Sequence, residues 1–159
     1  MKKILNPYLN KEGYNCVCCA PNNPVGLHLE FWEDGEDILT IWNPGENYQG
    51  WINTLHGGII SMLMDEVAGW VINRKLQTTG VTMQLNVKYK KPVMTTESQI
   101  TVRGHIASQR RPVQHPADSV YARNHRLRCH RLERQHHVRP DGCALRGRML
   151  VHQALREAA

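Results

Sequence analysis

The chain has 159 residues, of which 41% are hydrophobic, enough for one globular domain with its own core. It has no apolar run of about 18 residues and no signal peptide, because its first residues, MKKILNPYLN, meet proline and polar residues too soon; we therefore expect a soluble, cytoplasmic protein with no membrane partner. The net charge of +6 is unevenly distributed, since residues 1–102 hold 8 Lys and Arg against 10 Asp and Glu, whereas residues 103–159 hold 12 against 4.

Three of the five cysteines, Cys16, Cys18 and Cys19, lie close together near the start of the chain. The odd total of five cysteines, and the distance in sequence from these three to the other two, do not suggest a secreted disulfide framework. Cys16 and Cys19 form a C-x-x-C pair, but two thiols do not complete a four-ligand zinc site. We interpret them as structural or incidental thiols and expect no metal and no cofactor.

Residues 26–42 predict a β-hairpin. Apolar Leu27, Leu29 and Phe31 alternate with polar residues, and Asp34-Gly35 is a strong turn signal before the second strand. The Gly-, Pro- and Asn-rich stretch that follows, residues 43–51, is predicted to be a loop.

A helix is predicted from His56 to about Lys75, because its apolar residues cover most of its circumference, as in a buried helix. Residues 81–91 then alternate cleanly, with Val81, Met83, Leu85, Val87 and Tyr89 on one face, and Pro92 ends this strand. Residues 97–106 predict another strand. This order indicates an α+β fold in which an antiparallel sheet wraps around one long central helix.

Asp65 and Glu66 lie in the middle of this apolar helix. A buried carboxylate costs several kcal/mol unless it is paired, hydrogen-bonded or protonated. Only one of the two need face inward, because successive helix positions point about 100° apart. We expect Glu66 to be solvated or salt-bridged and Asp65 to be functional. The local pattern of His56-Gly57-Gly58 alone is equally compatible with a tight entry to the helix.

Together these residues resemble the hotdog-fold acyl-CoA thioesterases, in particular the phenylacetic-acid-degradation type. The resemblance is carried by HGG, the nine-residue step from His56 to Asp65, and the flanking stretches NPVGLHLEF and VTMQLNVKYKKPV. It covers residues from about 16 to 106, and Gln109-Arg110-Arg111 still resembles the family's entry to its penultimate strand.

The chemistry follows from helix geometry together with this resemblance. Gly57 is expected at a helix N-terminus, where unpaired N–H groups and the dipole stabilise an oxyanion. Asp65 lies about 12 Å further along the axis, so Gly57 and Asp65 of one chain cannot easily contact the same substrate carbonyl. The resemblance implies a site shared by two antiparallel helices of a homodimer, with a dimer of dimers as the larger assembly. It also implies that Asp65 is general base or nucleophile, that His56 positions the carbonyl or the loop, and that Thr82 holds the attacking water.

The expected partner is an acyl-CoA substrate. Asn53 either lines its pocket or caps a loop, and Gly58 completes the motif that receives the acyl group. Arg74, Lys90 and Lys91 are candidate ligands for the phosphates of coenzyme A, with ordinary surface positions as the alternative.

Residues 107–159 depart from this pattern. A hotdog sheet needs about two more strands after Ile106, but no alternation there is long enough to predict one with confidence. We therefore divide the chain into a hotdog thioesterase-like domain, 1–106, and an atypical Arg- and His-rich segment, 107–159. The interpretation we favour is a frameshift, in the gene or in its reading, that begins near Arg111.

Three other interpretations of this segment stay open. The first is a basic tail that binds nucleic acid, although the segment has no aromatic platform. The second is a zinc site formed by Cys129, His130, His136, His137 and Cys143. The third is a diverged but foldable end of the domain. The sequence thus predicts an acyl-CoA thioesterase that releases a free acid and coenzyme A. The alternatives are a non-catalytic nucleic-acid-binding protein and an inactive, truncated or frameshifted hotdog protein.

Overall fold

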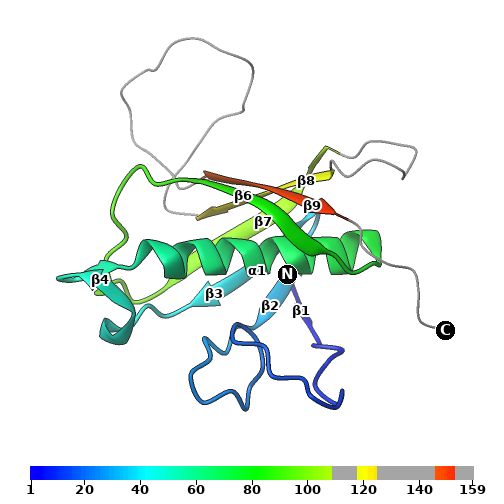
Figure 1. The fold of residues 1–159 in the computed structure, drawn as a ribbon, viewed down its shortest axis with the longest axis horizontal. Helices are drawn as coiled ribbons and strands as arrows, with labels where there is room; N and C mark the ends of the chain where they lie inside the picture. The colour runs from blue at the N-terminus through cyan, green and yellow to red at the C-terminus, as the bar shows by residue number, and fades with distance from the viewer. Residues whose placement is uncertain (109–117, 125–145, 153–159) are drawn as a thin grey trace, which may run out of the picture.

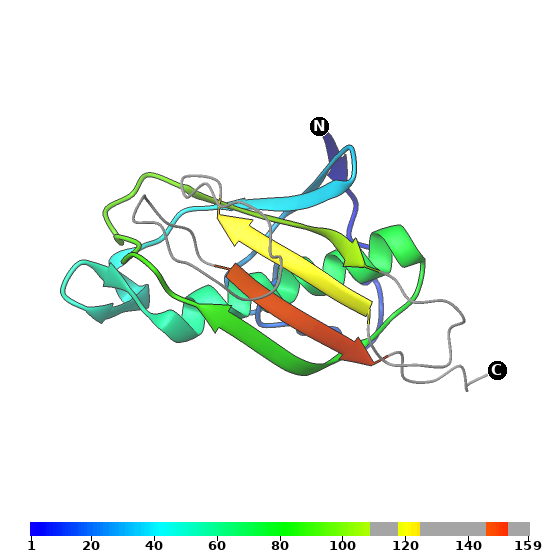
Figure 2. The same cartoon turned by 90° about the horizontal axis from the view of Figure 1, so that it is seen from above.

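The computed structural model describes residues 1–108, 118–124 and 146–152 of the chain. A seven-stranded sheet, in the order β1-β2-β3-β7-β8-β9-β6, curves around one long helix, α1 (Figures 1 and 2). Neighbouring strands pair antiparallel throughout. The strands of this sheet are β1 (Lys2–Ile4), β2 (Phe31–Asp34), β3 (Asp37–Trp42), β6 (Val81–Lys88), β7 (Ile100–Ser108), β8 (Asp118–Asn124) and β9 (Arg146–His152). The predicted α+β arrangement is confirmed.

Helix α1 (Gly57–Leu76) confirms the helix predicted from His56 to about Lys75. It ends where Gln77 adopts the left-handed conformation with φ of 53°. Arg74 and Lys75 lie in its last turn, where positive charge is favourable beside the negative end of the helix dipole. Its buried side chains form much of the hydrophobic core; they are Ile60, Leu63, Met64, Val67, Ala68, Trp70, Val71 and Ile72.

The predicted hairpin exists, but its first strand is shorter than expected. Strand β2 begins only at Phe31, and Asp34 pairs with Asp37 across the turn, where Gly35 has φ of 60°. Leu27 and Leu29 are buried, yet their amides donate to the carbonyls of Val17 and Cys18 instead of to a neighbouring strand. The prediction of a strand from Leu27 was wrong because this segment pairs with the cysteine-bearing loop.

The predicted loop at residues 43–51 contains regular structure as well. A short 3-10 helix, η1 (Glu46–Tyr48), leads into strand β4 (Gln49–Trp51), which pairs with β5 (Thr54–Leu55) in a separate small sheet. The turn between these two strands places Asn53 at a φ of 56°. This hairpin brings the chain to the start of α1.

Two strands lie in the C-terminal segment for which the sequence predicts none with confidence. Strand β8 pairs with β7 through Val120 and Ile106, and β9 pairs with β8 and with β6. The backbone of Met149 lies between Val120 on β8 and Leu85 on β6. In this fold the C-terminal segment therefore joins β6 to the rest of the sheet.

Several predictions concern residues outside the described ranges. They include the start of the frameshift near Arg111 and the zinc ligands proposed between Cys129 and Cys143. No helix within 1–108, 118–124 and 146–152 is both long enough and apolar enough to cross a lipid bilayer.

Candidate active site

The HGG motif forms the N-terminal cap of α1. His56 has extended backbone angles, and its Nδ1 accepts a hydrogen bond of 2.9 Å from the N–H of Gly58. The imidazole thus satisfies one of the amides that a helix N-terminus leaves without an intrahelical partner. Because the N–H of Gly58 is engaged by His56, the neighbouring N–H of Gly57 is the better placed of the two to meet an acyl oxygen.

Tyr89, just beyond β6, covers this end of the helix. Its hydroxyl donates a hydrogen bond of 3.0 Å to the carbonyl of Gly57 and also bonds to the hydroxyl of Ser61. A Cβ built at Gly57 would lie 3.5 Å from the Tyr89 ring. The glycine therefore leaves room for one more small group between the helix backbone and this ring.

Sequence reasoning missed the role of Tyr89. Alternation placed it on the apolar face with Leu85 and Val87, which are partly buried, whereas Tyr89 itself is 50% exposed. Its ring lies across the helix end because the strand has finished by Lys88. The one sequence feature that could have indicated this contact is Ser61, which lies one helical turn after Gly57 and presents a hydroxyl on the same face of the helix.

Asp65 and Thr82 are in direct contact. The hydroxyl of Thr82 donates a hydrogen bond of 2.6 Å to Oδ1 of Asp65. Asp65 is half-buried on α1, and Thr82 is the second residue of β6. The pairing of β6 with β9 shifts register between Thr82 and Gln84, an irregularity of the kind that redirects side chains beside functional sites.

The two parts of the site lie at successive points where β6 crosses α1. Thr82 meets Asp65, and seven residues later Tyr89 meets Gly57 and Ser61. Strand and helix therefore run antiparallel here. The step of eight positions from Gly57 to Asp65 spans about 12 Å of helix, so the amide and the carboxylate of one chain do not converge on one carbonyl.

Glu66 differs from the expectation of a solvated or salt-bridged residue. Its half-buried carboxylate accepts hydrogen bonds from the Sγ of Cys19 at 2.9 Å and from Nε1 of Trp70 at 3.0 Å. These donors are uncharged, and among the described residues no basic side chain pairs with this acid. Burial, followed by the hydrogen bond to Glu66, raises the pKa of the Cys19 thiol, which keeps it protonated and able to donate.

The candidate basic residues lie at opposite ends of α1. Arg74, in the last turn, pairs with Glu33 at 3.0 Å, whereas Lys90 and Lys91 are exposed just beyond β6, next to the residue that covers Gly57. Arg74 and Gly57 are separated by 17 helical residues, or about 26 Å along the axis. Of these three candidates, the two lysines are the ones that follow Tyr89, the residue that contacts the HGG motif.

Asn53 lies in the turn of the small β4–β5 hairpin that precedes the motif. Its side chain is exposed, and its carbonyl accepts a hydrogen bond of 2.9 Å from the amide of Thr95. A positive φ is tolerated better by asparagine than by most residues, so the turn itself accounts for its presence.

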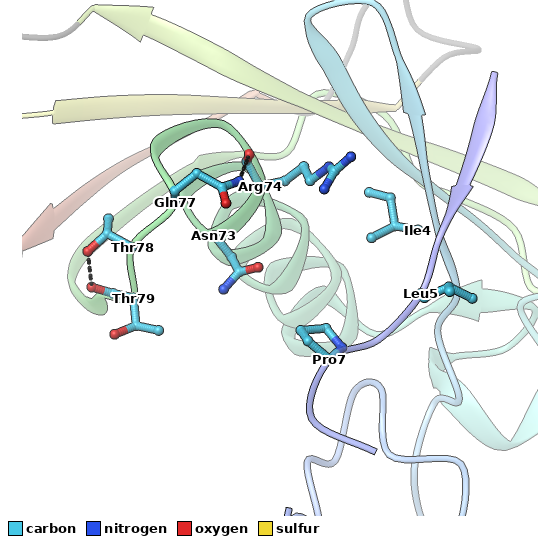
Figure 3. A pocket seen from close by; sticks show the side chains of 8 residues that line it. All are labelled: Ile4, Leu5, Pro7, Asn73, Arg74, Gln77, Thr78 and Thr79. Atoms are coloured by element: carbon cyan, nitrogen blue, oxygen red, sulfur yellow. Dashed lines mark hydrogen bonds between the residues drawn. The ribbon is translucent and has the colours of Figure 1, made fainter. Parts of the chain in front are cut away.

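Two pockets lie along the second half of α1, away from the HGG motif. A pocket of about 190 Å³ is lined by residues that include Cys16, Cys19 and Glu66. A second, of about 500 Å³, lies between the N-terminal strand and the end of the helix, and Figure 3 shows Arg74 and Gln77 on one side of it and Ile4 and Leu5 on the other. Asn73 and Thr79 line both pockets, so the two hollows adjoin.

Comparisons with known proteins agree with this geometry. The model of a family described as the thioesterase superfamily matches residues 52–115, the range that holds the HGG motif, Asp65 and Thr82. No curated protein matches the sequence.

Solved structures with the same fold carry the same description. A crystallised thioesterase superfamily protein superposes with a TM-score of 0.63 and 19% identity over 86% of this chain, which spans 63% of that protein's length. A thioesterase superfamily protein from Shewanella loihica gives 0.60 and 19% over 80% of this chain and 91% of that one. A thioesterase from Haemophilus influenzae gives 0.58 and 17% over 79% of this chain and 78% of that one.

The hotdog fold and the resemblance to its thioesterases are thereby confirmed. The narrower resemblance to the phenylacetic-acid-degradation type stays a prediction. Cys16 and Cys19 lie outside the residues that the family model matches.

Proposed function

We propose that this chain, which has the hotdog fold and matches the thioesterase superfamily over residues 52–115, hydrolyses an acyl-coenzyme A to a free acid and coenzyme A. The observation that carries the proposal is the hydrogen bond from Thr82 to Asp65, on the same helix whose N-terminus has a glycine, Gly57, with no side chain to block its amide. A carboxylate held by a hydroxyl and a helix N-terminus with room for an oxyanion are the two groups that thioester hydrolysis needs.

In the proposed reaction, water adds to the thioester carbonyl carbon. Asp65 accepts a proton from the attacking water, and the oxyanion of the tetrahedral intermediate is stabilised by the amide of Gly57 and the helix dipole. The intermediate collapses by breaking its carbon–sulfur bond, and the coenzyme A thiolate leaves and takes up a proton. Thr82 orients Asp65, and His56 holds the helix N-terminus in shape through its hydrogen bond to Gly58.

Asp65 can instead attack the carbonyl carbon itself and form a mixed anhydride that water then cleaves. Turnover in water enriched with oxygen-18 distinguishes the two routes. Label enters only the released acid if Asp65 is a base, and it also enters the Asp65 carboxylate if Asp65 is a nucleophile and water cleaves the anhydride at the Asp65 carbonyl. Mass spectrometry of the peptide that contains Asp65 measures this.

The site requires two copies of the chain. Gly57 and Asp65 of one helix are about 12 Å apart along the axis, and an antiparallel second helix brings one chain's amide beside the other chain's carboxylate. Strand β6 is last in the sheet order, and Val81 on it is 61% exposed. These features support a homodimer that covers this side of α1 and β6. Lys90 and Lys91, which follow Tyr89 in the chain, are the residues that we propose contact the phosphates of coenzyme A.

The function is tested with purified chain and a panel of acyl-coenzyme A substrates, with release of the free thiol as the readout. We expect Asp65→Asn to lower kcat by about 100-fold or more, because it removes the base but keeps the shape. Glu30→Gln is the matched control, since it also removes one negative charge and lies at an exposed surface ion pair with Lys3. Hydrolysis that Asp65→Asn leaves unchanged would refute the proposal.

The shared site is tested by mixing two inactive variants. In a mixed dimer of Asp65→Asn and Gly57→Val chains, one site combines two intact residues and the other combines two altered ones. An equal mixture that has been unfolded and refolded together should regain about a quarter of the wild-type activity, because half of the dimers are mixed. A site built within one chain predicts no recovery.

A further inference from the structure

A cluster of two thiols and a carboxylate lies on a different side of α1 from the Thr82–Asp65 pair. Cys16 and Cys19 come from the N-terminal loop, and Glu66 comes from the helix some 50 residues later in the chain. Their Sγ atoms and one carboxylate oxygen all lie within 4.8 Å of one another. The fold therefore adds a third candidate ligand to the C-x-x-C pair, one that the sequence alone did not connect to it.

The spacing of these atoms is close to that of a tetrahedral zinc site. With Zn–S bonds of about 2.3 Å and Zn–O bonds of about 2.0 Å, two sulfurs lie about 3.8 Å apart and a sulfur and an oxygen about 3.5 Å apart. The carboxylate oxygen Oε1 of Glu66 lies 3.8 Å from Sγ of Cys16 and 2.9 Å from Sγ of Cys19. Shifts of less than about 1 Å, within reach of side-chain rotation, convert one arrangement into the other.

The groups around the cluster also suit a bound cation. The backbone N–H of Cys18 donates to Sγ of Cys16 at 3.3 Å, which is the kind of bond that stabilises a metal-bound thiolate. Nε1 of Trp70 donates to Oε1 of Glu66 at 3.0 Å and so fixes the orientation of the carboxylate. The hydroxyl of Tyr14 lies 2.9 Å from Sγ of Cys19.

The cluster is accessible to an ion. Cys16, Cys19 and Glu66 line the pocket of about 190 Å³, together with Tyr8 and Tyr14. Three protein ligands leave the fourth position of a tetrahedral ion open toward this pocket, for water or for a further oxygen ligand. A borderline-soft divalent cation fits two sulfurs and one carboxylate better than Mg²⁺ or Ca²⁺, which prefer oxygen ligands alone.

We propose that Cys16, Cys19 and Glu66 bind one divalent cation of the zinc class, which fixes the N-terminal loop against α1. Such a site is independent of thioester hydrolysis, and its two cysteines lie outside the range that matches the thioesterase family. Its role is to replace weak thiol-to-carboxylate hydrogen bonds by metal–ligand bonds between two segments far apart in the sequence.

The test uses Co²⁺, which occupies tetrahedral zinc sites and reports sulfur ligation through a charge-transfer absorption. This readout is needed because seven of the nine histidines lie between His105 and His152 and can hold metal without sulfur. The background is the full chain with Cys129→Ser and Cys143→Ser, which serves as the matched control for cysteine substitution. We expect one Co²⁺ per chain, displaced by Zn²⁺, and a rise in melting temperature with Zn²⁺.

Adding Cys16→Ser, Cys19→Ser or Glu66→Gln to this background should weaken Co²⁺ binding by about 100-fold or more. The proposal is overturned if the folded background chain shows no sulfur-to-cobalt band. It is also overturned if the band is undiminished in both the Cys16→Ser and the Cys19→Ser variant. Where a variant fails to fold, alkylation of the unsubstituted chain decides, since Zn²⁺ should protect Cys16 and Cys19 from iodoacetamide. Unprotected thiols, or a Cys16–Cys19 disulfide in place of metal in the chain purified under reducing conditions, would also overturn it.

Discussion

The hydroxyl of Thr82 on β6 holds Oδ1 of Asp65 on α1 at 2.6 Å, and this bond joins the sheet to the acid in the middle of the buried helix. A hydroxyl that donates to a carboxylate fixes its rotamer and leaves its second oxygen to accept a proton. Asp65 is therefore positioned by a residue of strand β6, and the sequence of the helix alone gives no sign of this contact.

Thr82→Val is expected to lower kcat by about tenfold to a hundredfold, because it removes a hydrogen bond to a charged group but keeps the side chain's shape. Thr82→Ser retains the hydroxyl and should recover most of the activity. Steady-state hydrolysis of an acyl-coenzyme A by the two variants measures this. Activity that is retained in Thr82→Val but lost in Thr82→Ser would indicate that the methyl group, and not the hydrogen bond, is what matters.

Gly57→Ala is expected to reduce hydrolysis without destabilising the fold. The added Cβ lies 3.5 Å from the Tyr89 ring, an ordinary contact, but it takes the space through which an acyl oxygen reaches the amide. Gly69→Ala is the control within the same helix, since its Cβ meets no atom within 4 Å. It should stabilise the protein by up to about 1 kcal/mol and leave kcat unchanged. Urea unfolding measures the change in stability, and kcat measures the change in catalysis. Undiminished activity in Gly57→Ala would show that Gly57 is not part of the active site.

Glu33 makes the stability of the protein depend on pH. Hydrogen bonds from Lys75, at 2.7 Å, and from Arg74, at 3.0 Å, lower the pKa of its carboxyl group below the usual range. A group with a lowered pKa in the folded state contributes stability above its unfolded pKa and loses it as pH falls through the folded pKa. Unfolding free energies should therefore fall between about pH 6 and pH 3, and Glu33→Gln should reduce this fall by less than about 1 kcal/mol, as expected for a partly exposed ion pair. An identical pH profile in Glu33→Gln would mean that the pair contributes nothing.

The long helix, the hairpin turn at Asp34-Gly35 and the residues of the HGG motif were predictable because each is encoded by neighbours in sequence. The helix has apolar residues all round, and the turn has a glycine with φ of 60°. The partners of Glu66 were not predictable, because Cys16 and Cys19 reach it from a loop 47 to 50 residues away. Nothing in the helix distinguishes an acid that meets thiols from one that meets solvent.

The last strands were missed for a related reason. In the middle of a sheet, pairing on both sides supplies the backbone hydrogen bonds, so a strand there can form without the alternation that marks a half-buried one. Strands β8 and β9 both have neighbours on each side, β7 and β9 in one case and β8 and β6 in the other. Their place in the sheet depends on long-range pairing, which the periodicity of residues 107–159 does not record.

This pairing allows a direct test of whether the C-terminal segment contributes to the fold. The backbone of Met149 on β9 lies opposite Val120 on β8 and Leu85 on β6, at the centre of the pairing that joins β6 to the sheet. Proline lacks the N–H that a central strand needs, so Met149→Pro should destabilise the protein by about 3 kcal/mol or more. Ala158→Pro, which makes the same replacement outside the described strands, is the control and should leave the urea midpoint unchanged. If both variants unfold like the unsubstituted chain, β9 does not support β6 in solution, and the interpretation of residues 107–159 as a frameshifted remainder gains strength. A large loss confined to Met149→Pro means that the segment as written completes the sheet on which Thr82, and through it Asp65, depends.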